Sequence, residues 1–508
     1  MPASFLHGVE IVEVNAGAVP VSVVKSAVMG LVGSAPSWAV EAPAQAPAPE
    51  TPTLVSSAID AAKFGPLIRG YTIPYAISAI QAQGAGQIIV VNVFDQSEHF
   101  TSIASTAFAF PATGAQVVNL GHMGVAKVMV KNSAQTVTYV EDADYLLDAV
   151  NGLVRAKAGG TITNGESVKI AFDYADPSTV TDAEIIGTVS GSLFTGIEAL
   201  QTAYGRFGFS PKILIAPGHS QNAAVAQALS SMAEKLRSIA LVDSSPSVAP
   251  ADAIANRADS GESFGTSSKR AVLCYPQERF FDAGIVPTGV TLSSTGAAVP
   301  AHVNSAAVGP YSHWVAGAMA AKDLERGYWW SPSNTELRGV LGPDVALYAS
   351  AVDAGSDVNE LNAQGIVTVF NAFGTGLRVW GNRSAAYPSS TTPDNFISVR
   401  RTMDVIEESV QLSMLQFIDQ PITNALIAAI LANVNSFVRT LIQRGALVGG
   451  SASFDPAKNP PSEISAGHLV FDVDVMPPPP AERITFNVFI DTELLSGLAT
   501  ASPLVAAA

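Results

Sequence analysis

Two hydrophobic periods follow one another in the last third of the chain, and each predicts a different element. Apolar side chains recur every three or four positions over residues 396–417 and again after Pro421, which is typical of two amphipathic helices. We expect Pro421 in the first turn of the second helix, where its missing N–H costs nothing. Arg439, Arg444 and Gly445 indicate where that helix ends, because cations suit a helix C-terminus and glycine commonly follows it.

The helices are followed by two runs in which apolar and polar residues alternate, the pattern of β-strands. The first predicted strand has an apolar face of Leu469, Phe471, Val473 and Val475. The second has an apolar face of Ile484, Phe486, Val488 and Ile490. Residues 477–480 between them are all proline, which predicts a stiff crossover because proline cannot continue a ladder of hydrogen bonds.

The start of the chain has a third strand pattern without an obvious partner. Over residues 4–15, Val9 and Ile11 fall on one face, and Val12 and Val14 fall on the other. A strand that is apolar on both faces needs a sheet to join, and no neighbouring segment has the pattern of a hairpin partner. The sequence therefore predicts an N-terminal arm that pairs elsewhere.

Strand and helix patterns alternate through much of the remaining chain, which predicts a parallel sheet covered by helices. Strands are expected at residues 27–33, 87–94, 212–216, 239–242 and 271–274, and helices at residues 73–83, 193–204, 220–236 and 311–325. From about residue 95 to residue 176 the pattern changes to short alternating runs separated by Gly and Asn turns. This stretch predicts a small all-β module, a barrel, inserted into the α/β domain.

The low charge density adds information about the surface. Charged residues are 14% of the 508-residue chain, against roughly 25% in soluble domains, and this length predicts about two to four domains. A surface covered by neighbouring subunits would explain so few charges; a polar surface rich in Ser, Thr, Asn and Gln is the alternative. The net charge of −16 argues against a general nucleic-acid binder, which normally carries a basic patch.

Targeting and membrane segments are not expected. The apolar stretch near residue 20 has Glu10 and Glu13 before it instead of a basic region, and Pro20 and Lys25 interrupt it, so we expect no export signal. The chain has no run of about 18 uninterrupted apolar residues, so we expect no membrane-spanning helix. The single cysteine, Cys274, excludes an intrachain disulfide and fits assembly in a reducing compartment.

A serine protease is the sharpest enzymatic alternative. The Gly-Thr-Ser run that ends at Ser267 resembles the nucleophile motif of subtilisin-like enzymes. His219 precedes it but lies in the context PGHSQ, and Asp173 or Asp176 would complete a triad only with stretched spacing. We therefore expect Ser267 in a polar loop and no catalysis.

Metal and cofactor sites have little support. The seven histidines are not spaced as in HExxH, and Asp142, Asp144 and Asp148 lack the glycine pattern of a calcium loop. Cys274 lies in an apolar run that predicts a buried strand, so we expect a structural side chain and not a nucleophile. We expect no cofactor.

Charged residues gather on one face of the first late helix. Arg400 and Asp404 are four positions apart, a favourable helix pair that contributes only a few tenths of a kcal/mol. Glu407 and Glu408 add acidic groups. This face is either solvated or docks a partner.

Five short motifs carry a family resemblance in combination. They are LNAQG from Leu361, RVWGNR from Arg378, RR with a later EES from Arg400, RGAL from Arg444 and NPP from Asn459. With these motifs, and most strongly over residues 331–336, 361–383 and 400–490, the chain resembles the sheath protein of contractile phage tails and tail-like bacteriocins.

The resemblance implies a multidomain α/β fold and no enzyme activity. The implied parts are an N-terminal arm at 1–24, a central subtilisin-like α/β domain without protease machinery at 25–94 and 181–375, an inserted β-barrel-like domain at 95–180, a tube-facing α+β domain at 376–480, and a C-terminal arm at 481–508. Residues 9–14 and 484–490 would be strands exchanged between subunits, and the strand from Leu469 to Val475 would receive one. The residues expected as candidates to face an inner tube are Arg400, Arg401, Asp404, Glu407 and Glu408.

The resemblance also implies partners and a location. The subunit would polymerise as a helical sleeve around a tail tube protein, contact baseplate and tail terminator proteins, and contract to drive the tube through a cell envelope. It would bind no nucleic acid directly, insert into no membrane, and belong to the virion after assembly in the host cytoplasm. The sheath of another contractile injection system, a subtilisin-like hydrolase and a surface-layer shell protein are the alternatives.

Overall fold

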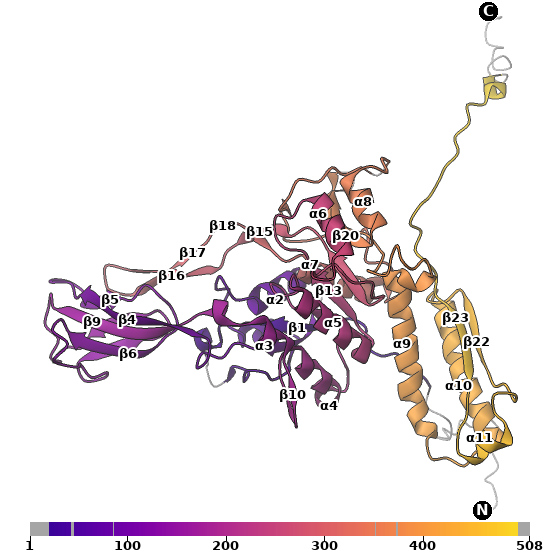
Figure 1. The fold of residues 1–508 in the computed structure, drawn as a ribbon, viewed down its shortest axis with the longest axis horizontal. Helices are drawn as coiled ribbons and strands as arrows, with labels where there is room; N and C mark the ends of the chain where they lie inside the picture. The colour runs from indigo at the N-terminus through magenta and orange to yellow at the C-terminus, as the bar shows by residue number, and fades with distance from the viewer. Residues whose placement is uncertain (1–19, 42–44, 85, 351, 372–373, 496–508) are drawn as a thin grey trace, which may run out of the picture.

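The computed structural model describes residues 20–41, 45–84, 86–350, 352–371 and 374–495. The predicted strand with Val9, Ile11, Val12 and Val14 lies outside these residues, as does the end of the C-terminal arm from residue 496. Figure 1 shows a β-rich module, a central α/β domain and a helical C-terminal domain in a row, and an extended segment that leads away from the last of them.

An eight-stranded sheet forms the centre of the molecule. Its order is β2 (Thr53–Val55), β3 (Gln87–Asn92), β1 (Val28–Gly33), β12 (Ile213–Ile215), β13 (Ile239–Asp243), β14 (Ala271–Cys274), β20 (Ile366–Asn371) and β21 (Leu377–Trp380). The six inner strands run parallel, and β2 and β21 are antiparallel edge strands. The predicted parallel sheet is therefore confirmed.

Helices cover both faces of this sheet, which is why its strands are continuous apolar runs. On one face lie α2 (Ile73–Ala82) and α7 (Ser312–Arg326), and on the other lie α3 (Asp182–Ile186) and α5 (Ala223–Leu236). The remaining helices are α1 (Ala58–Ala62), α4 (Ala203–Phe207), α6 (Pro250–Ala255) and α8 (Asp357–Ala363). Each fully buried large side chain contributes about 1.5–3 kcal/mol.

The predicted helix at residues 193–204 is confirmed only from Gly196 onward. The segment forms β11 (Leu193–Phe194), paired with β10 (Val189–Ser190), then a 3-10 helix (Gly196–Thr202) that leads into α4. Gly196 has a φ of +53°, and a Cβ there would lie 2.4 Å from the Glu184 carbonyl oxygen. The chain turns at Gly196 in a left-handed conformation that suits glycine, so the helix cannot extend back to Leu193.

The β-rich module consists of two three-stranded antiparallel sheets. One contains β4 (Phe100–Ala109), β9 (Ser167–Ala175) and β6 (Val125–Asn132), and the other contains β5 (Val117–Asn119), β8 (Leu153–Ala156) and β7 (Tyr145–Asp148). The sheets share a core that includes Phe110, Val130 and Ile170. Across residues 95–180, all of them described, no strand pair joins the two sheets, so the predicted barrel is not closed.

A long ribbon from the central domain runs along this module (Figure 1). It contains β15 (Glu278–Asp282), β16 (Ile285–Leu292), β17 (Ala298–His302) and β18 (Ser305–Gly309), and β19 (Gly342–Pro343) pairs with its base. The Met123 amide donates to the Pro287 carbonyl at 2.9 Å, and Arg155 Nη2 donates to the Gly296 carbonyl at 2.8 Å. The ribbon therefore holds the module against the central domain.

The C-terminal domain is built on two long helices. Its elements are α9 (Ile397–Met414), α10 (Asn424–Gln443), β22 (Gly449–Ser453), α11 (Pro461–Ser465) and β23 (Asp472–Met476). The prediction for Pro421 is wrong: it precedes the N-cap Thr423, whose hydroxyl accepts from the Leu426 amide at 3.1 Å. The predicted helix end is confirmed, since Gly445 follows the C-cap Arg444 with a φ of +77°.

By length and composition alone, α10 is long and apolar enough to cross a membrane. The sequence did not predict this, because polar residues interrupt its apolar run. In the structure it is an amphipathic core helix. Val434, Phe437 and Leu441 on one side pack with Ile406 of α9, while small or polar residues such as Ala432 occupy the exposed side. This pattern is that of a helix packed on one face.

Candidate assembly surface

The C-terminal sheet has two strands, and their outer edges differ. β22 and β23 pair antiparallel from Gly449 opposite Met476 to Ser453 opposite Asp472. On the outer edge of β22, the Asn435 side chain accepts from the Ala452 amide at 2.8 Å and donates to the Ala452 carbonyl at 3.0 Å. On the outer edge of β23, no strand of the described chain pairs.

The unpaired edge of β23 presents main-chain groups to an incoming strand. Because Ala452 directs its amide and carbonyl to Asn435, the opposite residue Val473 directs its own away from β22, and Val475 does the same two residues later. A row of unpaired N–H and C=O groups is a template for another strand.

The predicted receiving strand is shorter than expected. Val473 and Val475 lie in β23, whereas Leu469 and Phe471 precede it. Phe471 packs instead beside Phe417 in a small hydrophobic cluster and lies 5.4 Å from the Phe454 ring. This contact draws the chain out of the strand, which alternation alone could not reveal.

Residues 477–490 leave this sheet as a segment without helix or strand. Figure 1 shows it leading away from the body. Its apolar side chains are largely exposed, at 69% for Ile484, 83% for Phe486, 88% for Val488 and 95% for Ile490. The predicted second strand is therefore not paired within the described chain, although its sequence keeps the alternation of a strand.

The first described residues connect the C-terminal domain with the central sheet. The Ser22 amide donates to the Ser413 hydroxyl of α9 at 3.3 Å, and the Val24 amide donates to the Ser409 hydroxyl at 3.1 Å. The chain then enters β1 at Val28. The segment is thus tied along α9 before it joins the central domain.

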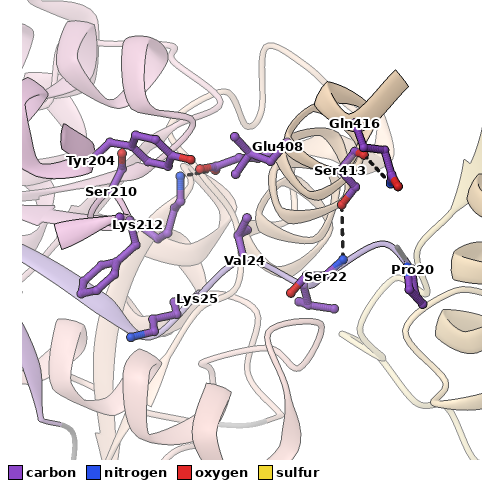
Figure 2. Close-up of a pocket in the computed structure, with 14 residues that line it drawn as sticks. Pro20, Ser22, Val24, Lys25, Tyr204, Ser210, Lys212, Glu408, Ser413 and Gln416 are labelled. Atoms are coloured by element: carbon purple, nitrogen blue, oxygen red, sulfur yellow. Dashed lines mark hydrogen bonds and ion pairs between the residues drawn. The ribbon is translucent and has the colours of Figure 1, made fainter. Parts of the chain in front are cut away.

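A cavity of about 410 Å³ lies beside this N-terminal segment (Figure 2). Val24, Tyr204, Phe209 and Leu412 contribute to a mostly apolar wall, and the pair between Lys212 and Glu408 closes one side. Its lining comes from both domains, so it is a gap at their contact.

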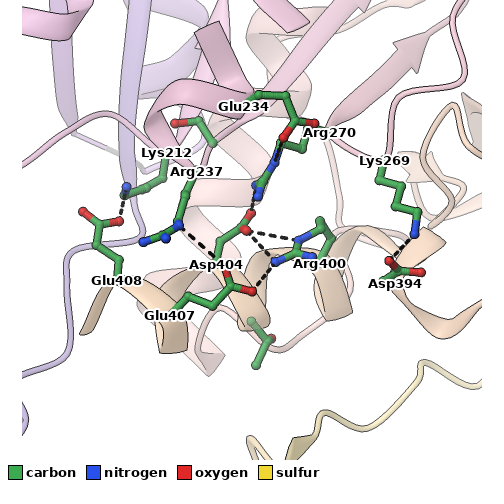
Figure 3. A network of polar contacts seen from close by, with 12 residues as sticks. Lys212, Glu234, Arg237, Lys269, Arg270, Asp394, Arg400, Asp404, Glu407 and Glu408 are labelled. Atoms are coloured by element: carbon green, nitrogen blue, oxygen red, sulfur yellow. Dashed lines mark hydrogen bonds and ion pairs between the residues drawn. The ribbon is translucent and has the colours of Figure 1, made fainter. Parts of the chain in front are cut away.

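The contact between α9 and the central domain combines the buried side chain of Ile397 with a network of charged side chains (Figure 3). Asp404 pairs with Arg270 of the central domain and, at 2.7 Å, with Arg400 of its own helix. Arg400 also lies 2.9 Å from Glu407. Buried pairs of this kind are costly to break, because the remaining partner is left charged without compensation.

Arg401 makes the most buried of these contacts. Its Nη1 donates to Asp323 of α7 at 2.8 Å, and the side chains of Arg401 and Asp323 are only 4% and 1% exposed. The pair joins residues 78 positions apart in the chain.

The expectation that this face of α9 meets a tube stays a prediction, and its five residues already have partners within the chain. Arg401, Asp404, Glu407 and Glu408 pair with residues of the central domain, and Arg400 pairs with Asp404 and Glu407 of its own helix. Helical spacing placed these charges together, but it could not show that four of them pair with the central domain.

The candidate protease residues do not come together. Ser267 lies exposed in a loop, and His219 Nδ1 lies 3.0 Å from Asp182 Oδ1. Asp173 pairs with Lys127 at 2.9 Å, and Asp176 caps a short 3-10 helix. No hydrogen bond between described residues joins Ser267 to His219, so these side chains do not form a triad.

The other candidate residues have structural surroundings. Cys274 is fully buried in β14, and burial raises the pKa of its thiol well above the usual value. Asp144 Oδ1 accepts from the Thr161 amide at 3.0 Å, and Asp148 accepts from the Asn151 amide at 3.1 Å. The described residues contain no cluster of three or more His, Cys, Asp or Glu suited to a metal.

Sequence reasoning missed Asn435, Asp323 and Arg270. Each acts on a partner distant in sequence, such as Asp404, which lies 134 positions from Arg270. No motif or spacing indicates such pairs.

Comparisons with known proteins agree with this arrangement. The family model for the phage tail sheath protein central domain matches residues 194–385, and the model for the phage tail sheath C-terminal domain matches residues 389–491. A family of unknown function matches residues 96–199, which include most of the β-rich module.

Individual relatives are similar over most of the chain. The tail sheath protein of Burkholderia phage BcepMu is 42% identical over 498 residues, covering 97% of this chain and 98% of the relative. That of Escherichia phage P2 is 26% identical over 395 residues, covering 74% and 92%.

Solved structures share the fold. The helical sheath of the anti-feeding prophage in its contracted state has a TM-score of 0.56 at 17% identity, covering 96% of this chain and 100% of that one. The sheath complex of an extracellular contractile injection system, also contracted, has a TM-score of 0.54 at 16% identity, covering 97% and 100%.

Proposed function

This chain belongs to the phage tail sheath family and is a structural sheath subunit, not an enzyme, and we propose how its subunits are joined. Strand exchange at the C-terminal sheet connects each subunit to a neighbour. Residues 484–490 of one subunit add to the open edge of β23 in a neighbouring subunit. The main-chain groups of Val473 and Val475 then gain partners, and alternate side chains of the incoming segment become buried.

One observation carries this proposal: the chain presents both an unpaired strand edge and an exposed apolar segment with a strand pattern. The proline linker at residues 477–480 separates the two, and its extended conformation prevents a tight hairpin back onto β23. The donor and the acceptor therefore belong to different subunits.

The same contact explains polymerisation. Donor and acceptor are different surfaces, so the contact is heterologous, and a heterologous contact that does not close produces a helical filament. Residues 9–14, outside the described part, are proposed as a second exchanged strand. Contraction is then a rigid-body rearrangement of domains, with the arms as tethers between subunits.

A tail tube protein is proposed as the partner on the inner side. Since most of the charged residues of α9 pair with the central domain, we propose the exposed side of α10, with Ala425, Ala428, Ala432 and Ser436, as the surface nearer the tube. Baseplate and tail terminator proteins are proposed at the two ends of the sheath, with assembly in the host cytoplasm. A subtilisin-like ancestry of the central domain stays a prediction.

A truncated chain tests strand exchange. A variant that ends at Arg483 keeps every helix and strand through β23 and the proline linker, and removes the segment from Ile484 onward. We expect a folded monomer by circular dichroism and no tubes in negative-stain electron microscopy, under conditions where the full chain forms tubes. The control ends at Leu495 and should still polymerise; normal tubes from the shorter variant would contradict strand exchange.

A further inference from the structure

We infer that Arg383 is a positioning residue for assembly: it holds Glu482 and thereby fixes the place where the C-terminal arm leaves the subunit. The inference rests on the proposed strand exchange, since it concerns the delivery of the exchanged segment. Arg383 ends the RVWGNR motif, whose first three residues lie in β21, and neither the sheet nor the domain contact gave Arg383 itself a role.

The Arg383 side chain is fixed before it meets the arm. Its guanidinium carbon lies over two aromatic rings, 4.3 Å from the centre of Tyr387 and 4.0 Å from the centre of Phe396. Its Nη1 donates to Asn395 Oδ1 at 2.8 Å. These cation–π contacts and the hydrogen bond hold the guanidinium and leave Nε and Nη2 for a further partner.

That partner is the Glu482 carboxylate. Glu482 Oε1 accepts from Arg383 Nε at 3.0 Å, and Oε2 accepts from Nη2. A two-point contact between a guanidinium and a carboxylate defines the orientation of both groups as well as their separation. A lysine would keep the charge and lose this fork.

The contact lies at the root of the arm. β23 ends at Met476, the prolines follow, and Glu482 comes before the exposed run that begins at Ile484. A cavity of about 490 Å³ between Asn362, Trp380 and the arm root separates the arm from much of the surface beneath it. Pro477 is buried at the start of the linker, and the Glu482 carboxylate is the last side-chain attachment before the exposed run, so it sets the direction in which that run leaves.

Loss of this attachment should spread the arm over many directions. Fewer arms would then point at the neighbour's β23, which lowers the effective concentration of the exchanged strand. We expect the protein concentration needed for polymerisation to rise on the order of tenfold, as for the loss of one hydrogen-bonded charge pair.

Spin labels on the monomer test the geometry directly. Cysteines replace the exposed Ser389 and Ile484, the buried Cys274 stays unlabelled, and pulsed electron paramagnetic resonance measures the distance between the labels. We expect one narrow distribution without further substitution and a broad one with Glu482→Gln, which leaves the stacked Arg383 intact. Arg383→Lys should also broaden it, and the adjacent Arg483→Ala is the control. Unchanged distances in Glu482→Gln would overturn the inference.

An assembly assay separates this inference from the strand-exchange proposal. If the variant ending at Arg483 forms no tubes and Glu482→Gln forms them at the same concentration as the native chain, the exchange stands and the positioning role fails. If the variant ending at Arg483 forms normal tubes, the exchange itself fails. A raised concentration threshold for Glu482→Gln, with Arg483→Ala unchanged, supports both.

Discussion

The central sheet and the C-terminal sheet differ in how much of each the subunit itself covers. In the central sheet, helices cover both faces, and residues 334–337 exchange main-chain hydrogen bonds with the outer edge of β21. In the C-terminal sheet, Asn435 covers part of one edge, and the other edge, at Val473 and Val475, has no partner strand in the described chain. The first sheet is largely covered within the subunit, and we propose that the second gains a further strand in the assembly.

The interactions between the two domains differ from those inside each domain. Apolar side chains form the core of each, whereas ion pairs such as Arg401 with Asp323 connect α9 to the central domain. Buried pairs of this kind fix the position of α9 against the central domain, because breaking one leaves a charge without compensation.

The largest effect should come from closing the open edge. Val473→Pro removes an N–H that points away from β22, so the sheet should survive while strand addition fails. We expect folded monomers and no tubes by electron microscopy. Asp474→Pro is the matched variant: its N–H faces β22, so it should lower the stability of the domain itself in urea unfolding. Tubes from Val473→Pro at the native concentration would show that β23 is not the receiving edge.

Breaking the buried contact between the regions should come next. Asp323→Ala leaves the Arg401 guanidinium buried without a carboxylate, and we expect the free energy of unfolding to fall by about 3–5 kcal/mol. Urea unfolding followed by fluorescence measures it. The double variant Asp323→Leu with Arg401→Met should lie near the native stability; an equal loss in both variants would show that the charge pair is not the cause.

A smaller effect should be a pH dependence of the free energy of unfolding that arises from Asp243, the last residue of β13 in the central sheet. It accepts from Ser220 and Ser312, yet burial raises its pKa from 3.8 to about 6. Between those pH values the folded state binds more protons than the unfolded state, so the stabilising contribution present below pH 3.8 is lost as pH rises to 6. Urea midpoints of the native chain should therefore fall relative to those of Asp243→Asn over this range; a constant difference would contradict it.

The smallest effect should come from the exposed pair at the start of β23. Lys458 Nζ lies 2.7 Å from Asp472 Oδ1, and both side chains contact solvent. Exposed pairs contribute little because water screens them. Lys458→Ala should match the native chain in both urea midpoint and tube formation, and a clear loss of tubes would mean that this end of β23 takes part in the exchange.

The sequence predicted helices and strands better than it predicted the side-chain contacts that those elements make with distant parts of the chain. Five of the six inner strands, all but β20, followed from the sequence pattern, as did α7, α9 and the helix end at Gly445, because each depends on neighbours close in the chain. Phe471 left its strand and Arg401 turned into the body because of distant partners, Phe417 and Asp323. Alternation also identified residues 484–490 as a strand pattern, and the structure adds that no described strand pairs with it.

The most direct test of the central claim is a cryo-electron microscopy structure of tubes formed by the full chain. Strand exchange predicts that residues 484–490 of one subunit form a third strand beside β23 of another, hydrogen-bonded to Val473 and Val475. An unpaired β23 edge in the tube, or residues 484–490 folded onto their own subunit, would contradict it.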